Sequence, residues 1–73
     1  MENEILNYLK TKFNNKLKVE VEFIDFRKYK IITIINEDKI ETDFVYDFGF
    51  TFETNMIVLS ERICKLIIDY YLS

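Results

Sequence analysis

The chain has no histidine, tryptophan or proline, one cysteine (Cys64) and one glycine (Gly49). Enzymes usually rely on histidine as a general base or to activate a nucleophilic cysteine, so these absences argue against catalysis. A lone cysteine also excludes the disulfide framework that a small secreted domain normally needs. The sequence therefore predicts a non-enzymatic protein of the cytoplasm. Cys64, beside an apolar helical stripe, is expected to be a small buried hydrophobe.

The 73 residues are enough for one domain, residues 1–73, with one core. Hydrophobic residues make up 49% of the chain and aromatic residues 16%, a composition that favours an ordered core over disorder. The acidic start Met1–Glu4 differs from the positive start of a signal peptide. Since no apolar run approaches the roughly 18 residues of a membrane span, no membrane association is expected.

The first predicted element is a helix. Apolar residues from Ile5 to Phe13 recur at steps of three and four residues, and Asn3 is in a position to cap this segment. Asn14 and Asn15 are expected to end it.

Three strands are expected to follow. A period of two over residues 17–23 predicts the first strand, an apolar, β-branched run over 29–35 predicts the central strand, and alternation over 40–53 predicts a long third strand. A turn is expected around residues 25–28, and a bulge or tight bend at Gly49. Helical spacing returns after Asn55, or after Ser60 if that serine caps a shorter last helix.

This order predicts an α+β fold, α-β-β-β-α, with a three-stranded antiparallel sheet and both helices packed on one face. A two-residue turn at Glu37 and Asp38 would place Ile31 opposite Phe44 on the covered face. The other face would be open to water. The residues expected to line the covered face are Val19, Val21, Phe23, Ile31, Phe44, Tyr46 and Phe50.

The open sheet face is the candidate binding surface, because its strands place carboxylates around an apolar stripe. Charge also differs along the chain, with a net +2 over residues 1–30 and −5 over residues 31–73. An acidic face with an apolar centre suits a basic partner protein, since charge steers the encounter and apolar contacts add buried area. The alternative is a hydrated face whose isoleucines stay exposed or pair in a homodimer, which the free edges of the outer strands could also build. The candidate partner-binding residues are Glu20, Glu22, Ile32, Ile34, Glu37, Asp38, Glu41, Asp43, Val45 and Asp47.

Other chemistry is disfavoured by spacing. Glu41 and Asp43 are spaced like hydrated strand residues, so neither a metal site nor a cofactor is expected. The triplet Asp47-Phe48-Gly49 matches the magnesium triplet of kinases, but no other kinase motif is present. Aromatic residues of the third strand could stack on nucleic acid bases, but their alternation predicts burial.

The element order resembles that of the double-stranded RNA-binding domain. That family has a basic cluster at the start of its last helix, where this chain has Glu53, Thr54, Asn55 and Met56. A net charge of −3 also repels polyphosphate. Direct nucleic acid binding is therefore not expected, and a module like the double-stranded RNA-binding domain is kept as an alternative function.

A second resemblance rests on the element order, on the turn Ile34-Ile35-Asn36-Glu37-Asp38 and on the acidic strand residues beside it. In these features the chain is similar to the small phage-encoded anti-CRISPR proteins that inhibit type II-A Cas9. Its many Ile, Lys, Asn, Phe and Tyr residues are also typical of low-GC bacteria and their phages. The resemblance implies an inhibitor, in the host-cell cytoplasm, of a CRISPR effector nuclease. The carboxylates that would stand in for phosphates are Glu37, Asp38, Glu41, Asp43 and Asp47.

Overall fold

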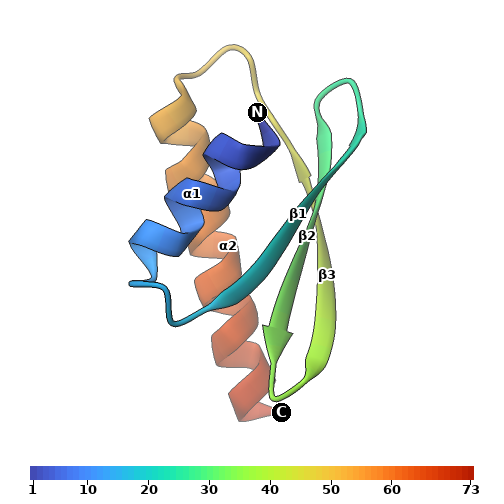
Figure 1. The fold of residues 1–73 in the computed structure, drawn as a ribbon, viewed down its shortest axis with the longest axis vertical. Coiled ribbons are helices and arrows are strands. Elements are labelled where there is room, and N and C mark those ends of the chain that lie inside the picture. The colour runs from blue at the N-terminus through green and yellow to red at the C-terminus, as the bar shows by residue number, and fades with distance from the viewer.

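The computed structural model describes residues 1–73 and confirms the predicted fold. The elements are, in order, the helix α1 (Glu2–Lys12), the strands β1 (Lys18–Asp25), β2 (Lys28–Ile35) and β3 (Asp38–Val45), and the helix α2 (Phe52–Leu72). The sheet is antiparallel with strand order β1-β2-β3, and both helices lie on one face of it (Figure 1). Neither helix has the length and apolarity needed to cross a membrane.

Helix α1 ends before Asn14 and Asn15, as predicted, but it begins earlier than predicted. Met1 occupies the N-cap position and makes no side-chain capping bond, so the prediction of Asn3 as the cap is wrong. After the helix, Asn14 and Asn15 adopt φ values of 54° and 58°. Asparagine tolerates this left-handed region better than most residues, which explains why the pair ends the helix.

The β2–β3 hairpin turns at Asn36 and Glu37, one residue earlier than predicted. Their φ values of 50° and 70° are those of a two-residue type I′ turn, and asparagine favours this conformation. Ile31 therefore pairs with Thr42 rather than with Phe44. Side chains alternate with a period of two, so this shift of the pairing by two residues does not move side chains of the paired strands from one face to the other.

The core fills the space between the covered sheet face and the two helices. Its members are Ile5, Leu9, Val19, Tyr29, Ile31, Phe44, Tyr46, Met56, Leu59 and Ile63. Two hydroxyl groups, those of Thr33 and Ser60, are buried beside these residues without a hydrogen-bond partner. A buried polar group without a partner weakens the fold, because it has lost its hydrogen bonds to water.

Strand β3 ends at Val45, so the prediction of a long third strand over residues 40–53 is wrong. The carboxylate Oδ1 of Asp47 accepts a hydrogen bond from the Gly49 N–H at 2.8 Å, and the Phe50 N–H donates to the Asp47 carbonyl at 3.2 Å. Aspartate often forms such local turns with the backbone that follows it. The predicted tight bend at Gly49 is confirmed.

Helix α2 begins at Phe52 with Thr51 as its N-cap. The Thr51 hydroxyl accepts the Thr54 N–H at 3.1 Å, which satisfies one of the free donors of the first turn. The predicted starts near Asn55 and Ser60 are both wrong, since these residues lie buried inside the helix.

Two residues predicted to line the covered face are exposed instead. Phe50 is 62% exposed because it follows the end of β3, and Phe23 is 46% exposed. Phe23 lies beside an irregularity in the β1–β2 pairing and packs edge-on against Tyr29, with ring centroids 5.5 Å apart.

Candidate functional site

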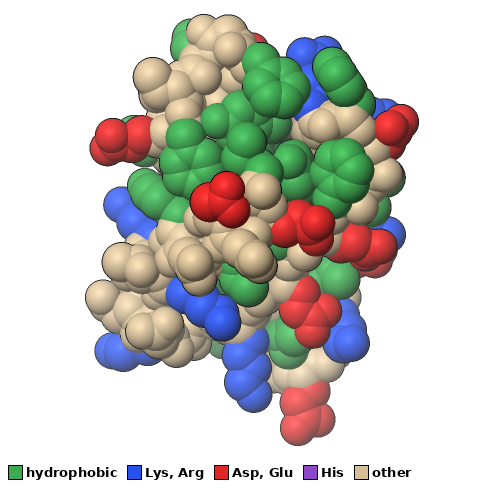
Figure 2. Space-filling view, turned by 45° about the horizontal axis from the view of Figure 1, so that its top comes forward, with side chains coloured by type: hydrophobic (Ala, Val, Ile, Leu, Met, Phe, Trp, Pro, Cys, Tyr) green, Lys and Arg blue, Asp and Glu red, His purple; other side chains and the backbone are tan.

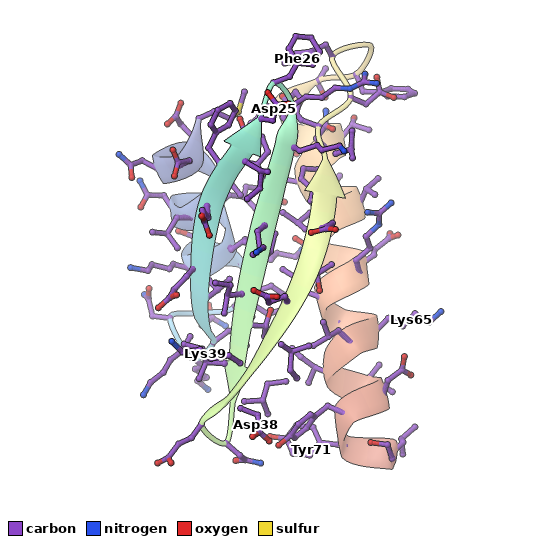
Figure 3. All side chains as sticks on the ribbon, turned by 90° about the vertical axis from the view of Figure 1, so that its right-hand side faces the viewer. Asp25, Phe26, Asp38, Lys39, Lys65 and Tyr71 are labelled. Atoms are coloured by element: carbon purple, nitrogen blue, oxygen red, sulfur yellow. The ribbon has the colours of Figure 1, made fainter.

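The open face of the sheet is formed by alternate residues of the three strands, and Figure 3 looks onto this side of the molecule. The pairing arranges its side chains in rows that run across the sheet. The rows are Lys18, Ile34 and Lys39; Glu20, Ile32 and Glu41; Glu22, Lys30 and Asp43; and finally Asp25, Lys28 and Val45.

The open face is close to balanced in charge rather than uniformly acidic. Lys28 and Lys39 belong to it by register, so four lysines accompany five carboxylates. Four of the carboxylates occupy the two middle rows, and Asp25 lies in the end row beside Lys28. The lysines lie between the four and in the two end rows. One of the lysines, Lys30, pairs with Glu41 at 3.4 Å between Nζ and Oε1. An exposed pair of this kind contributes little stability and can exchange for a partner's charge.

The predicted apolar stripe is divided in two. Ile32 and Ile34 are neighbours on β2 and are half-buried between the charged side chains of β1 and β3. Val45 lies two rows from Ile32, beyond Lys30, and is 45% exposed. The stripe therefore offers two small apolar contacts, separated by a row of charges.

Three predicted site residues lie away from this face. Glu37 is in the hairpin turn, and Asp47 is in the β3–α2 loop beyond the opposite end of β3. Asp38 points to the covered side, where its Oδ2 accepts a hydrogen bond from the Tyr70 hydroxyl at 2.7 Å. This bond raises the pKa of Tyr70, because it holds the phenolic proton beside a carboxylate.

A surface that sequence reasoning missed lies at the end of the molecule where the β1–β2 turn meets the β3–α2 loop. We call Phe26 and Phe48 the aromatic tip. They are 74% and 60% exposed, and their ring centroids are 6.0 Å apart in an edge-to-face arrangement. Figure 2 shows hydrophobic side chains gathered over this end. The missed signal was local, since Asp47 and Gly49 favour a turn that breaks the alternation.

The loop that carries Phe48 is fixed by a buried side chain. Asn55 is 4% exposed, and its Oδ1 accepts the Asp47 N–H at 2.8 Å. Its Nδ2 donates to the carbonyls of Asp47 and Thr51 at 2.9 Å each. These bonds tie the loop that carries Phe48 to the first turn of α2.

The remaining titratable groups are spread over the molecule rather than gathered in one place. No cluster of three or more cysteine, aspartate or glutamate side chains could hold a metal ion. The expected burial of Cys64 is wrong, because the thiol lies on the outward flank of α2. Burial raises the pKa of Tyr29, with Glu2 as the next cause.

The geometry thus offers two exposed surfaces, the open sheet face and the aromatic tip, on a small α+β domain. Comparison with known proteins adds no family to this description. No protein-family model, no curated protein and no solved structure matches the chain.

Proposed function

We propose that the protein is a non-enzymatic binding domain that inhibits a nucleic-acid-handling protein by docking the open face of its sheet on a basic surface. The observation that carries this proposal is the pair of middle rows, where carboxylates on both outer strands flank the central strand. The resemblance to anti-CRISPR proteins favours a CRISPR effector nuclease as the partner, in the cytoplasm of a bacterial host. The carboxylates are Glu20, Glu22, Glu41 and Asp43.

These four carboxylates define a spaced pattern rather than a diffuse charge. β1 and β3 are two strand spacings apart, so the acidic residues of one row are separated by about 10 Å. Residues two apart on a strand put the two rows about 7 Å from each other. A partner with arginine or lysine side chains at matching intervals would form several charge-assisted bonds at once.

The rest of the face favours a protein partner over a simple cation. Ile32 lies between two of the carboxylates and is half-buried, so docking would remove it fully from water. Lys18 and Lys39 at one end would repel a uniformly basic surface, and therefore restrict how the partner can sit.

The test is capture of the partner from a low-GC bacterial lysate, followed by nuclease assays with the captured protein. The double variant Glu20→Lys/Glu41→Lys should weaken capture at least tenfold, because it removes charge pairs at the interface and places like charges there. The matched control Glu53→Lys/Glu61→Lys makes the same charge change on exposed residues of α2 and should bind normally. Added salt should weaken binding of the wild type.

Two results would refute the proposal. One is a double variant that binds and inhibits as well as the wild type. The other is a partner whose contact surface is neutral or acidic.

Self-association is a second candidate function, and the exposed aromatic tip favours it. Phe26 and Phe48 present more apolar surface to water than the half-buried Ile32 and Ile34, so a homodimer would bury the tip more readily than the isoleucine stripe. Sedimentation at micromolar concentration would detect the dimer, and Phe48→Ser should dissociate it. A monomeric wild type would exclude this function.

A further inference from the structure

The outer edge of β3 has free backbone groups. The Tyr46 N–H donates to the carbonyl of Arg27 at 2.8 Å, which shows that even-numbered residues in this segment direct their backbone toward β2. Backbone direction alternates along an antiparallel strand, so Lys39, Glu41 and Asp43 direct their N–H and C=O groups outward. None of the three takes part in the backbone hydrogen bonds formed outside helices and strands. Such an edge is a template for another strand.

A groove runs between this edge and helix α2. A hollow of about 580 Å³ lies between Ile40 of β3 and Arg62 and Leu66 of α2. A second hollow, of about 270 Å³, continues from Arg62 to Val58 and Phe50 near the far end of β3. Arg62 lines both hollows, so together they follow the length of the strand. In Figure 3, α2 lies beside β3, and Lys65 extends on the side of the strand's free edge.

The groove combines apolar surface with unpaired positive charge. Val58 is 41% exposed and Leu66 is half-buried, although both belong to a helix that contributes to the core. Arg62 and Lys65 take part in neither of the two ion pairs of the structure. Asp69 lies on the same groove, in the turn of α2 after Leu66. An occupant should therefore present apolar side chains and a carboxylate to the helix.

We propose that this β3–α2 groove binds an extended peptide segment of a partner protein, which adds to β3 as a fourth strand. Its backbone would pair with Lys39, Glu41 and Asp43, and alternate side chains would enter the groove. The groove side would carry apolar residues around an acidic residue that faces Arg62 and Lys65. Side chains on the opposite side would lie next to Glu41 and Asp43, so basic residues fit there.

A second copy of the chain fits this edge poorly. A symmetric antiparallel pairing of two β3 edges would bring both α2 helices together on the same side of the sheet. Arg62 and Lys65 of one copy would then approach the same residues of the other, and like charges would repel. The charge of the groove therefore favours a different partner.

The probe for a direct test is the capped synthetic peptide Thr-Val-Lys-Glu-Lys-Val-Thr, which places valine, glutamate and valine on one side. In an NMR titration of the ¹⁵N-labelled protein, the amide signals of β3 and of α2 over residues 58–70 should shift. Hydrogen exchange at Lys39, Glu41 and Asp43 should slow as their N–H groups become paired. The same amides should exchange freely in the protein alone.

Variants separate strand addition from general attraction. Arg62→Glu should weaken the peptide about tenfold, as expected for reversing one interfacial charge, and replacing the peptide's glutamate with lysine should restore binding. Asp43→Pro removes an outward N–H and should weaken binding at least as much, whereas Asp43→Asn keeps the N–H and should bind more tightly than the proline variant.

The inference is wrong if the peptide produces no shifts at millimolar concentration or shifts another surface. It is also wrong if Arg62→Glu binds both peptides equally, or if the β3 amides are already protected in a dimer of the free protein. Arg62 does not belong to the open face, so this result stands apart from the capture assay with Glu20→Lys/Glu41→Lys.

Discussion

Replacement of Asn55 by alanine should lower the free energy of unfolding by about 2–4 kcal/mol, because it removes three hydrogen bonds of about 0.5–1.5 kcal/mol each. The site is 4% exposed, so water cannot readily replace the lost amide. In the variant, the backbone N–H of residue 55 still donates to the Thr51 carbonyl. The Asp47 N–H, in contrast, loses its acceptor, the side-chain oxygen of Asn55. Most of the loss should therefore arise at Asp47.

The expected loss is a large fraction of the total, since a chain of 73 residues has a free energy of unfolding of roughly 4–11 kcal/mol. Urea denaturation followed by circular dichroism is the appropriate assay. With a slope of about 1 kcal/mol per molar urea, the midpoint should fall by about 2–4 M. Glu61→Ala, an exposed change on the same helix, should stay within about 0.5 kcal/mol of the wild type. A similarly small effect of Asn55→Ala would show that the three bonds do not stabilise the loop.

Phe44→Ala should cost about 3–5 kcal/mol because the ring is 2% exposed, whereas Phe48→Ala should cost less than about 1 kcal/mol; equal shifts in thermal melts would contradict this assignment of core and tip. Thr33→Val should raise the free energy of unfolding by about 1 kcal/mol, because its buried hydroxyl has no partner, and a lower urea midpoint would show that the hydroxyl is bonded. The hydrogen bond to Asp38 raises the pKa of Tyr70 above its ordinary value of 10.0, so its contribution is present below that pH and is lost as the phenol ionises at higher pH. Tyr70→Phe should remove this alkaline loss in melts at several pH values, and wild-type and variant curves that fall in parallel would refute it.

The fold was predictable because the two changes of apolar period report which side chains face the core. Val19, Ile31 and Phe44 were assigned to the covered face from alternation alone, and all three are buried. The one-residue error in the hairpin turn does not change this assignment, since it shifts the pairing by two residues and side chains alternate with a period of two. The rows of the open face need the register itself, however, so alternation could not give their balance of charge.

The prediction failed where local hydrogen bonding competes with alternation. Residues 44–52 place an aromatic side chain at every second position, as a strand would. The backbone leaves the sheet after Val45 because Asp47 bonds to the following turn and Thr51 caps α2. These short polar contacts are weak sequence signals, although together they decide that Phe48 faces water.

Phe26 adopts a φ of 48° and leaves 74% of its surface in water. A left-handed backbone conformation costs a residue other than glycine about 1–2 kcal/mol. Because the Phe26 ring is mostly exposed, its burial offsets little of this cost. The Arg27 guanidinium lies 6.0 Å from the centre of the Phe26 ring. A cation–π contact at such an exposed site is weak and offsets only part of the cost. Asparagine or glycine would adopt this φ at a lower cost. The β1–β2 turn therefore holds an exposed aromatic ring at the expense of the stability of the free protein.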